Sequence, residues 1–180
     1  QVNGQWSSIG PEKGRTLSRR MTIFYRDAAK QLLESHPDKY MQAGIYSCYL
    51  LAPLDKSLRM PDNCLGQLCH GACHNHAITD PNCEVNAAFK QAMEEWAEVC
   101  PNLCFYEYYY KVAALDLPFP IIHSMREDLP WLRDIGLFGI YTQYKSNYWT
   151  IGLNYYVAAK LLWNADLDVD ALLEDYYRKM

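Results

Sequence analysis

Strand-like and helix-like segments alternate along this chain, and the alternation limits the possible folds more than any other feature of the sequence. The predicted order is helix, strand, strand, helix, strand, helix, strand, helix, helix. The predicted strands are apolar on both faces, which is typical of parallel strands covered by helices. We therefore expect an α/β fold built around a parallel sheet.

Local signals set the bounds of these elements. The predicted helices begin near Leu17, Glu84, Ser124, Ile151 and Val169. The predicted strands span residues 41–50, 64–70, 103–108 and 137–143. The predicted caps are Asn82 and Asp168, a capping box of Ser124 with Glu127, and Gly136 as a C-terminal stop.

Two parallel architectures fit this order, a doubly wound sheet and part of a (β/α) barrel. No glycine-rich phosphate-binding fingerprint follows a strand, which removes the best support for a nucleotide-binding sheet. A complete eight-stranded barrel takes about 250 residues, so four strands in 180 residues correspond to the C-terminal half of a (β/α)8 TIM-type barrel. The chain begins with Gln1 and ends on an uncapped Met180, so we expect residues 1–180 to be one barrel portion, truncated at both ends.

Composition narrows the class of partner. The net charge is −4, which argues against nucleic acid or an anionic membrane surface as a partner. The apolar runs are too short to span a membrane. The chain contains 15 Tyr, 5 Trp and 5 Phe, and tyrosine rings suit polar ligands with apolar faces, such as sugars. A core or a subunit interface would also account for most of these rings.

A barrel places its site at the C-terminal ends of the strands. The polar and aromatic residues predicted there are Tyr46, Ser47, Tyr49, His70, Glu107, Tyr108, Gln143 and Tyr144. Glu107 is the only carboxylate among them, and a carboxyl group in a ring-lined pocket usually has a raised pKa, which suits acid or base catalysis. The alternative is a Glu107 paired with a Lys or Arg at the rim. Asp116, Glu127 and Asp128 are interpreted as loop and helix-start acids.

Cysteine and histidine crowd into residues 69–76. Zinc could bind through Cys69, Cys73, His74 or His76, but the C-x-x-x-C spacing has no second pair to match it, and a c-type haem would need C-x-x-C-H. We expect instead a disulfide between Cys73 and Cys83, with no metal or cofactor. No nucleophile elbow is present, so serine or cysteine hydrolysis is not expected.

Several segments resemble the family called domain of unknown function 4838. The resemblance begins near Arg19, and its most specific part is the run from Lys160 to Asn164. The other matching segments are residues 73–83 with Asn86, Phe89 and Trp96, residues 106–108, residues 117–120, residues 136–143, residues 154–159 and residues 168–173.

That resemblance implies an exported, mostly bacterial, glycosidase-like barrel related to glycoside hydrolase family 163. It implies endo-acting cleavage beside an N-acetylglucosamine of N-glycans, with the acetamido group of the substrate as nucleophile and a general acid from the protein. The expected location is secreted, periplasmic or at the cell surface. The expected partners are a glycan or glycoprotein substrate and missing flanking domains of the same protein.

The resemblance also implies roles for residues. Glu107 matches an acidic position of the family and is expected to act as acid or base, or to orient the substrate. Asn3 would stand where relatives carry an acid after the fourth barrel strand. Sugar contacts are expected from Tyr46, Tyr49, His70, His76, Tyr108 and Gln143. Two other classes stay open: a non-catalytic carbohydrate-binding or interaction domain, and a zinc-stabilised domain of unrelated function.

Overall fold

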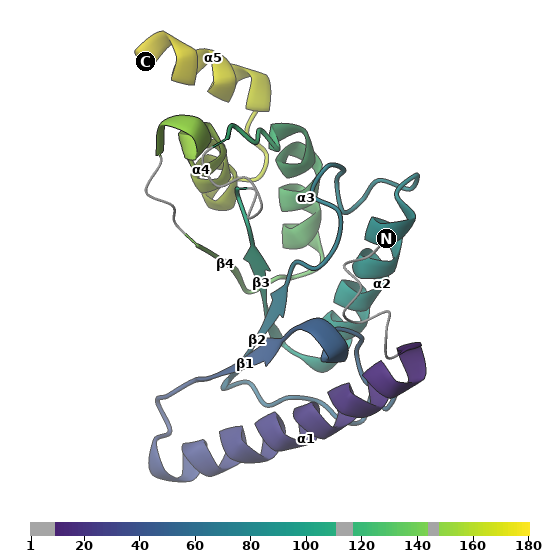
Figure 1. Cartoon of the computed structure of the whole chain (residues 1–180). Helices are drawn as coiled ribbons and strands as arrows, with labels where there is room; N and C mark the ends of the chain where they lie inside the picture. Colours follow the sequence, from purple (N-terminus) through teal and green to yellow (C-terminus); the bar gives the residue numbers. More distant parts are fainter. Residues whose placement is uncertain (1–9, 111–116, 144–147) are drawn as a thin grey trace.

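The structure is a computed structural model that describes residues 10–110, 117–143 and 148–180 (Figure 1). Nine helices and strands and one short 3-10 helix follow one another in the predicted order. They are α1 (Gly10–Ser35), β1 (Met41–Ile45), η1 (Ser47–Tyr49), β2 (Cys64–Cys69), α2 (Glu84–Val99), β3 (Asn102–Glu107), α3 (Ile122–Asp134), β4 (Gly139–Thr142), α4 (Tyr148–Trp163) and α5 (Val169–Lys179).

The four strands form one parallel sheet in the order β1-β2-β3-β4. Their register pairs Ile45 with Leu68, Cys69 with Tyr106, and Glu107 with Thr142. Since all four strands run in the same direction, their carboxyl ends meet at one edge. The residues predicted to form the site therefore come from this carboxyl edge.

The two faces of the sheet differ in what covers them. Side chains alternate between the faces of a strand, and Ile45, Leu68 and Phe105 belong to the buried core that includes Phe89 of α2 and Met125 of α3. Figure 1 shows α1, α2 and α3 following one another along the same side of the strands. We call this side the helix-covered face and the opposite side the open face.

This arrangement distinguishes the two candidate architectures. A doubly wound sheet reverses its strand order and carries helices on both faces. The described strands follow one another without a reversal. The α/β class with parallel strands is confirmed, and the arrangement is consistent with part of a (β/α) barrel. None of the helices among the described residues has the length and apolar character needed to cross a membrane.

Two predicted bounds are wrong at the N-terminal half of the chain. The first strand ends at Ile45 and not at Leu50, because Ser47 adopts a φ of 54°, in the left-handed region, and turns the chain into η1. Helix α1 begins at Gly10 and not near Leu17. The described side chains before Leu17 are mainly polar, with Glu12, Lys13 and Thr16 exposed, so apolar spacing does not reveal these turns.

Two of the predicted helix signals are confirmed. The carboxylate of Asp168 accepts hydrogen bonds from the N–H groups of Asp170 and Ala171, 2.9 and 3.4 Å long. Gly136 ends α3 with a φ of 78°. Its N–H donates to the carbonyl of Arg133 and the following N–H donates to that of Leu132, which is a Schellman motif.

Two other caps are wrong. The position before α2 is occupied by Cys83 and not by Asn82. Helix α3 begins before the predicted capping box, and Ser124 is buried inside it. The entry to α3 is instead held by a tertiary contact, because the N–H of Ile121 donates to the side-chain oxygen of Asn154 in α4 over 3.3 Å.

Candidate functional site at the carboxyl edge of the sheet

Glu107, at the end of β3, lies among hydrogen-bond donors. The Nδ1 atom of His70 lies 2.8 and 2.7 Å from its two carboxylate oxygens, and the N–H of Tyr108 donates to Oε1 over 2.6 Å. The Nδ1 atom of His74 lies 3.4 Å from Oε1. The side chains of His70 and Glu107 are only 4% and 9% exposed. The pair is therefore a buried carboxylate–imidazole contact.

The pKa of Glu107 is lowered, so the expectation of a raised pKa is wrong. Burial alone would raise it, but attraction to His70 and hydrogen bonds from His70 and His74 outweigh burial. Among the described residues its charged or ionisable partners are two histidines and not the Lys or Arg of the alternative. A carboxylate held in its charged form can orient an imidazole, but it is a poor proton donor.

Glu107 and His70 also lie on the helix-covered face. Glu107 is two residues after Phe105, and His70 is two residues after Leu68, so each shares the side of a core residue. The ring of His70 packs against that of Phe89 in α2, with centroids 5.1 Å apart. The pair therefore lies between the sheet and the helices.

A small cavity of about 20 Å³ adjoins this pair and reaches α3. That volume holds about one water molecule. Its wall includes His70, Tyr109, Ser124 and Asp128. Within the described residues, the Nε2 of His70, the hydroxyl of Tyr109 and the hydroxyl of Ser124 are buried without a hydrogen-bond partner. The interior of the helix-covered face is thus polar next to Glu107.

The interpretation of Asp128 as a loop or helix-start acid is wrong, because it lies in the middle of α3 with its side chain buried. It is 8% exposed, and its Oδ1 accepts a hydrogen bond from the N–H of Ile78 over 2.7 Å. Burial raises its pKa to about 7, although hydrogen bonds from the backbone of Ile78 and Thr79 act in the opposite direction. The sequence did contain a signal that Asp128 is buried, because it lies between Met125 and Leu132 on the apolar stripe of α3.

The open face carries a group of tyrosine rings, which we call the tyrosine cluster: Tyr106, Tyr108, Tyr110 and Tyr141. The rings of Tyr106 and Tyr141 are stacked, with centroids 5.3 Å apart and planes at 25°. Tyr108 makes edge contacts with Tyr106 and Tyr110, at 5.1 and 6.1 Å. Tyr141 is 58% exposed. Sequence reasoning missed it because it lies inside a predicted strand and not at its end.

Two predicted sugar contacts belong to the tyrosine cluster or adjoin it. Tyr108 is a member, and the hydroxyl of Tyr110 donates to the side-chain oxygen of Gln143. Tyr46 is 48% exposed just after β1. It is close enough to affect Tyr108, whose pKa is raised to about 12 by burial first and then by neighbouring groups that include Tyr106, Cys69 and Tyr46. Tyr108 therefore keeps its proton and can donate a hydrogen bond.

The remaining predicted residues lie elsewhere. Tyr49 is half-buried in η1, and His70 faces the helices. His76 is exposed in the loop between β2 and α2, beside Cys73. Asn3, Asp116 and Tyr144 lie outside the described residues. The structure thus splits the predicted site between the two faces of the sheet.

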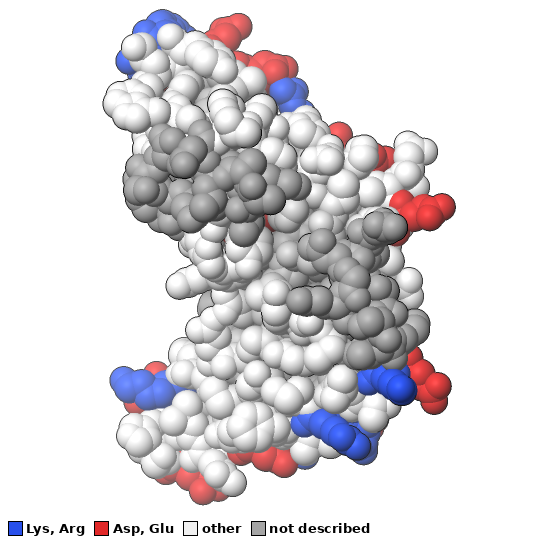
Figure 2. Space-filling model, in the orientation of Figure 1, with Lys and Arg blue, Asp and Glu red and all other residues white. Residues whose placement is uncertain are grey.

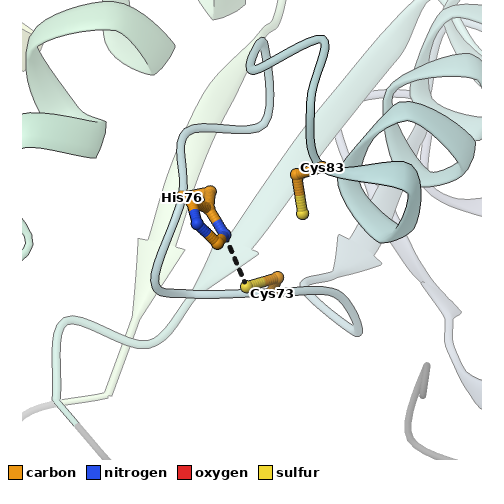
Figure 3. A group of neighbouring side chains, drawn as sticks. All are labelled: Cys73, His76 and Cys83. Carbon is orange, nitrogen blue, oxygen red and sulfur yellow. Dashed lines mark hydrogen bonds between the residues drawn. The ribbon is translucent and has the colours of Figure 1, made fainter.

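The predicted disulfide is not formed in the structure, where Cys73 and Cys83 are free cysteines. Their sulfur atoms and the Nδ1 atom of His76 all lie within 4.8 Å of one another (Figure 3). Among the described residues, His70, His74 and Glu107 form a second group with ligand atoms as close. These two groups are the places where the described chain could hold a metal ion.

Charge is unevenly distributed over the surface. Figure 2 shows the Lys, Arg, Asp and Glu side chains of the visible face gathered toward its two ends. The described residues between them on this face are mostly uncharged.

The fold and the site together define an α/β chain with four parallel strands, helices along one face and tyrosines at the carboxyl edge of the other. The model of the family described as Domain of unknown function (DUF4838) matches residues 4–180, so the chain belongs to this family. No curated protein and no solved structure matches it.

Proposed function

We propose that this chain is the carbohydrate-binding part of a glycosidase-type (β/α)8 barrel. The observation that carries the proposal is the stacked pair of Tyr106 and Tyr141 on the open face. Enzymes with this architecture bind their substrates at the carboxyl edge of the strands. The tyrosine cluster belongs to β3, β4 and the residues just after β3.

The chemistry of the tyrosine cluster suits a sugar ring. A pyranose has an apolar face of C–H groups and a rim of hydroxyls, and a tyrosine offers a flat apolar face and a hydroxyl. The exposed ring of Tyr141 rests on Tyr106, which is only 9% exposed, so little side-chain entropy is lost when a ligand stacks on it. Tyr108 and Gln143 supply polar groups next to this platform.

Glu107 takes the role of a positioning residue in this proposal. Its carboxylate contacts His74, whose ring makes an edge contact with Tyr108 at 6.3 Å. The charge on Glu107 therefore orders one border of the tyrosine cluster from the opposite face of the sheet. A buried carboxylate with a lowered pKa fits this role better than that of a general acid.

The reaction we propose for the complete barrel is endo-β-N-acetylglucosaminidase cleavage of N-glycans, assisted by the acetamido group of the substrate. It follows from the resemblance to glycoside hydrolase family 163. In this scheme the general acid comes from another segment of the barrel, since Glu107 holds its charge. The same proposal places Asn3 where relatives carry an acid, and it places the protein outside the cytoplasm, in a secreted, periplasmic or cell-surface location.

The lowered pKa of Glu107, which makes it a poor proton donor, favours a second candidate, a domain that binds glycans without cleaving them. Mass spectrometry of a complex-type N-glycoprotein incubated with the complete barrel that contains this chain separates the two. Loss of the glycan with one N-acetylglucosamine left on asparagine supports the hydrolase. Binding of the released N-glycan in a calorimetric titration, with no cleavage, supports the binding domain. If the protein shows no binding and no cleavage, both candidates are contradicted.

A further inference from the structure

Three potential metal ligands converge in the loop that joins β2 to α2. Cys73 and His76 come from the loop itself, and Cys83 comes from the position just before α2. Figure 3 shows the three side chains directed toward one another. The Sγ atom of Cys73 lies 3.4 Å from the Nδ1 atom of His76, and all three ligand atoms lie within 4.8 Å of one another.

These separations match those between zinc ligands. Zn–S bonds of about 2.3 Å and Zn–N bonds of about 2.0 to 2.1 Å place neighbouring ligands of a tetrahedron roughly 3.5 to 3.8 Å apart. The pair of Cys73 and His76 is already close to that range at 3.4 Å, and Cys83, within 4.8 Å of both, needs at most a small side-chain movement.

The fully buried side chain of Asn86 holds this loop in place. Its amide nitrogen lies 3.0, 2.9 and 2.8 Å from the carbonyl oxygens of Cys73, His76 and Ala77, which share its two N–H groups as donors. Its oxygen accepts from the N–H of Cys73 over 2.9 Å. One side chain of α2 therefore fixes the backbone of two of the three ligands, as outer groups around metal sites usually do.

We propose that Cys73, His76 and Cys83 bind one zinc ion, with a fourth position open to water. The two thiolates of the half-buried Cys73 and the buried Cys83 would balance the charge of Zn²⁺. The bound ion with these two ligands would therefore add no net charge to the interior. His76 is exposed, which leaves the site reachable from solvent. The site is independent of the carbohydrate-binding proposal.

The other candidate group is less suited to a metal. In the cluster of His70, His74 and Glu107, the Nδ1 atoms of both histidines already face the carboxylate. A metal there would have to replace contacts that a buried charge needs. In the group of Cys73, His76 and Cys83, the contact between Cys73 and His76 joins two of the proposed ligands and involves no buried carboxylate.

Metal analysis of the chain purified with reductant and zinc, and without chelator, is the first test. We expect about one zinc per chain, and with cobalt in place of zinc a thiolate-to-metal charge-transfer absorption in the near ultraviolet. Cys73→Ser, Cys83→Ser and His76→Ala should reduce the zinc content to background. The matched controls Cys48→Ser and His36→Ala, which lie outside the loop, should keep it.

A second measurement on the unmodified chain covers the case in which the variants do not fold. Zinc should protect Cys73 and Cys83 from alkylation and should leave the alkylation of Cys48 unchanged, as read by peptide mass mapping. Equal alkylation of Cys73 and Cys83 with and without zinc overturns the proposal. A zinc-free protein whose peptides are linked through Cys73 and Cys83 overturns it in favour of the disulfide.

Discussion

The two faces of the sheet use polar side chains in opposite ways. On the helix-covered face, Glu107, His70 and Asp128 are each less than a tenth exposed. Glu107 contacts His70, and Asp128 accepts a hydrogen bond from the backbone of Ile78. On the open face, the outermost ring of the tyrosine cluster, Tyr141, is more than half exposed. The helix-covered face therefore buries its polar side chains, and the open face exposes an uncharged aromatic ring that a ligand can reach.

The same comparison separates residues that hold the fold from residues that contact a ligand. If it is right, changes on the helix-covered face reduce stability, while changes on the open face reduce binding and leave stability nearly unchanged. The variants below test this division from the largest expected effect to the smallest.

Glu107→Gln should destabilise the protein strongly. The substitution keeps an acceptor for the N–H of Tyr108 but removes the charge that His70 and His74 face. A hydrogen bond to a charged group contributes about 1.5 to 3 kcal/mol, and urea denaturation measures the loss. Glu127→Gln, an exposed acid on α3, is the matched control and should change stability little. Equal midpoints for the two variants would show that the charge of Glu107 does not stabilise the fold.

Asp128→Asn should change how stability depends on pH. The pKa of Asp128 is about 7 in the folded protein and 3.8 in the reference state, so the folded state holds this proton more tightly. Its contribution to the free energy of unfolding is present below pH 4 and is lost as the pH rises toward 7, on the order of a few kcal/mol.

The Asn variant keeps an acceptor for the N–H of Ile78 and has no proton to lose. Denaturation series at several pH values between 4 and 8 should therefore show it gaining stability relative to the wild type as the pH rises. Parallel curves for the two proteins would contradict the raised pKa. Glu107, whose pKa is lowered, has the opposite sign, and its contribution is lost as the pH falls below about 4.

Gln143→Ala should have the smallest effect. It removes the acceptor of the hydroxyl of Tyr110 and leaves the stacked pair of Tyr106 and Tyr141 intact. Loss of one hydrogen bond costs about 1 kcal/mol, so we expect a small decrease in melting temperature. Gln42→Ala, at an exposed position of β1, is the control and should melt like the wild type. A larger decrease in melting temperature for Gln42→Ala than for Gln143→Ala would contradict a stabilising hydrogen bond between Tyr110 and Gln143.

Signals that act within a few residues were enough to predict much of the fold. The element order, the cap at Asp168 and the stop at Gly136 each depend on neighbouring residues alone, and all three are confirmed. The entry to α3 depends on Asn154 from a distant helix, so no local capping signal could reveal it. The first turns of α1 carry mainly exposed polar side chains, such as Glu12, Lys13 and Thr16, which apolar spacing does not detect.

The sequence placed the candidate residues after the ends of the strands but did not say on which face of the sheet each one lies. Alternation along β3 puts Glu107 on the side of Leu103 and Phe105, so the sequence contained the signal that it faces the core. Its partners could not be predicted, because His70 and His74 reach it from another strand and a loop. The predicted raised pKa failed for that reason: it considered burial without the two imidazoles.

The central claim is that the open face binds carbohydrate through the tyrosine cluster. The most direct test is a calorimetric titration of a complex-type N-glycan into the wild type, Tyr141→Ala and Tyr177→Ala, the last an exposed tyrosine on α5. We predict that Tyr141→Ala weakens binding at least tenfold, about 1.4 kcal/mol, with an unchanged melting temperature, and that Tyr177→Ala binds like the wild type. Equal affinity of all three proteins, or no binding by the wild type, would contradict the claim.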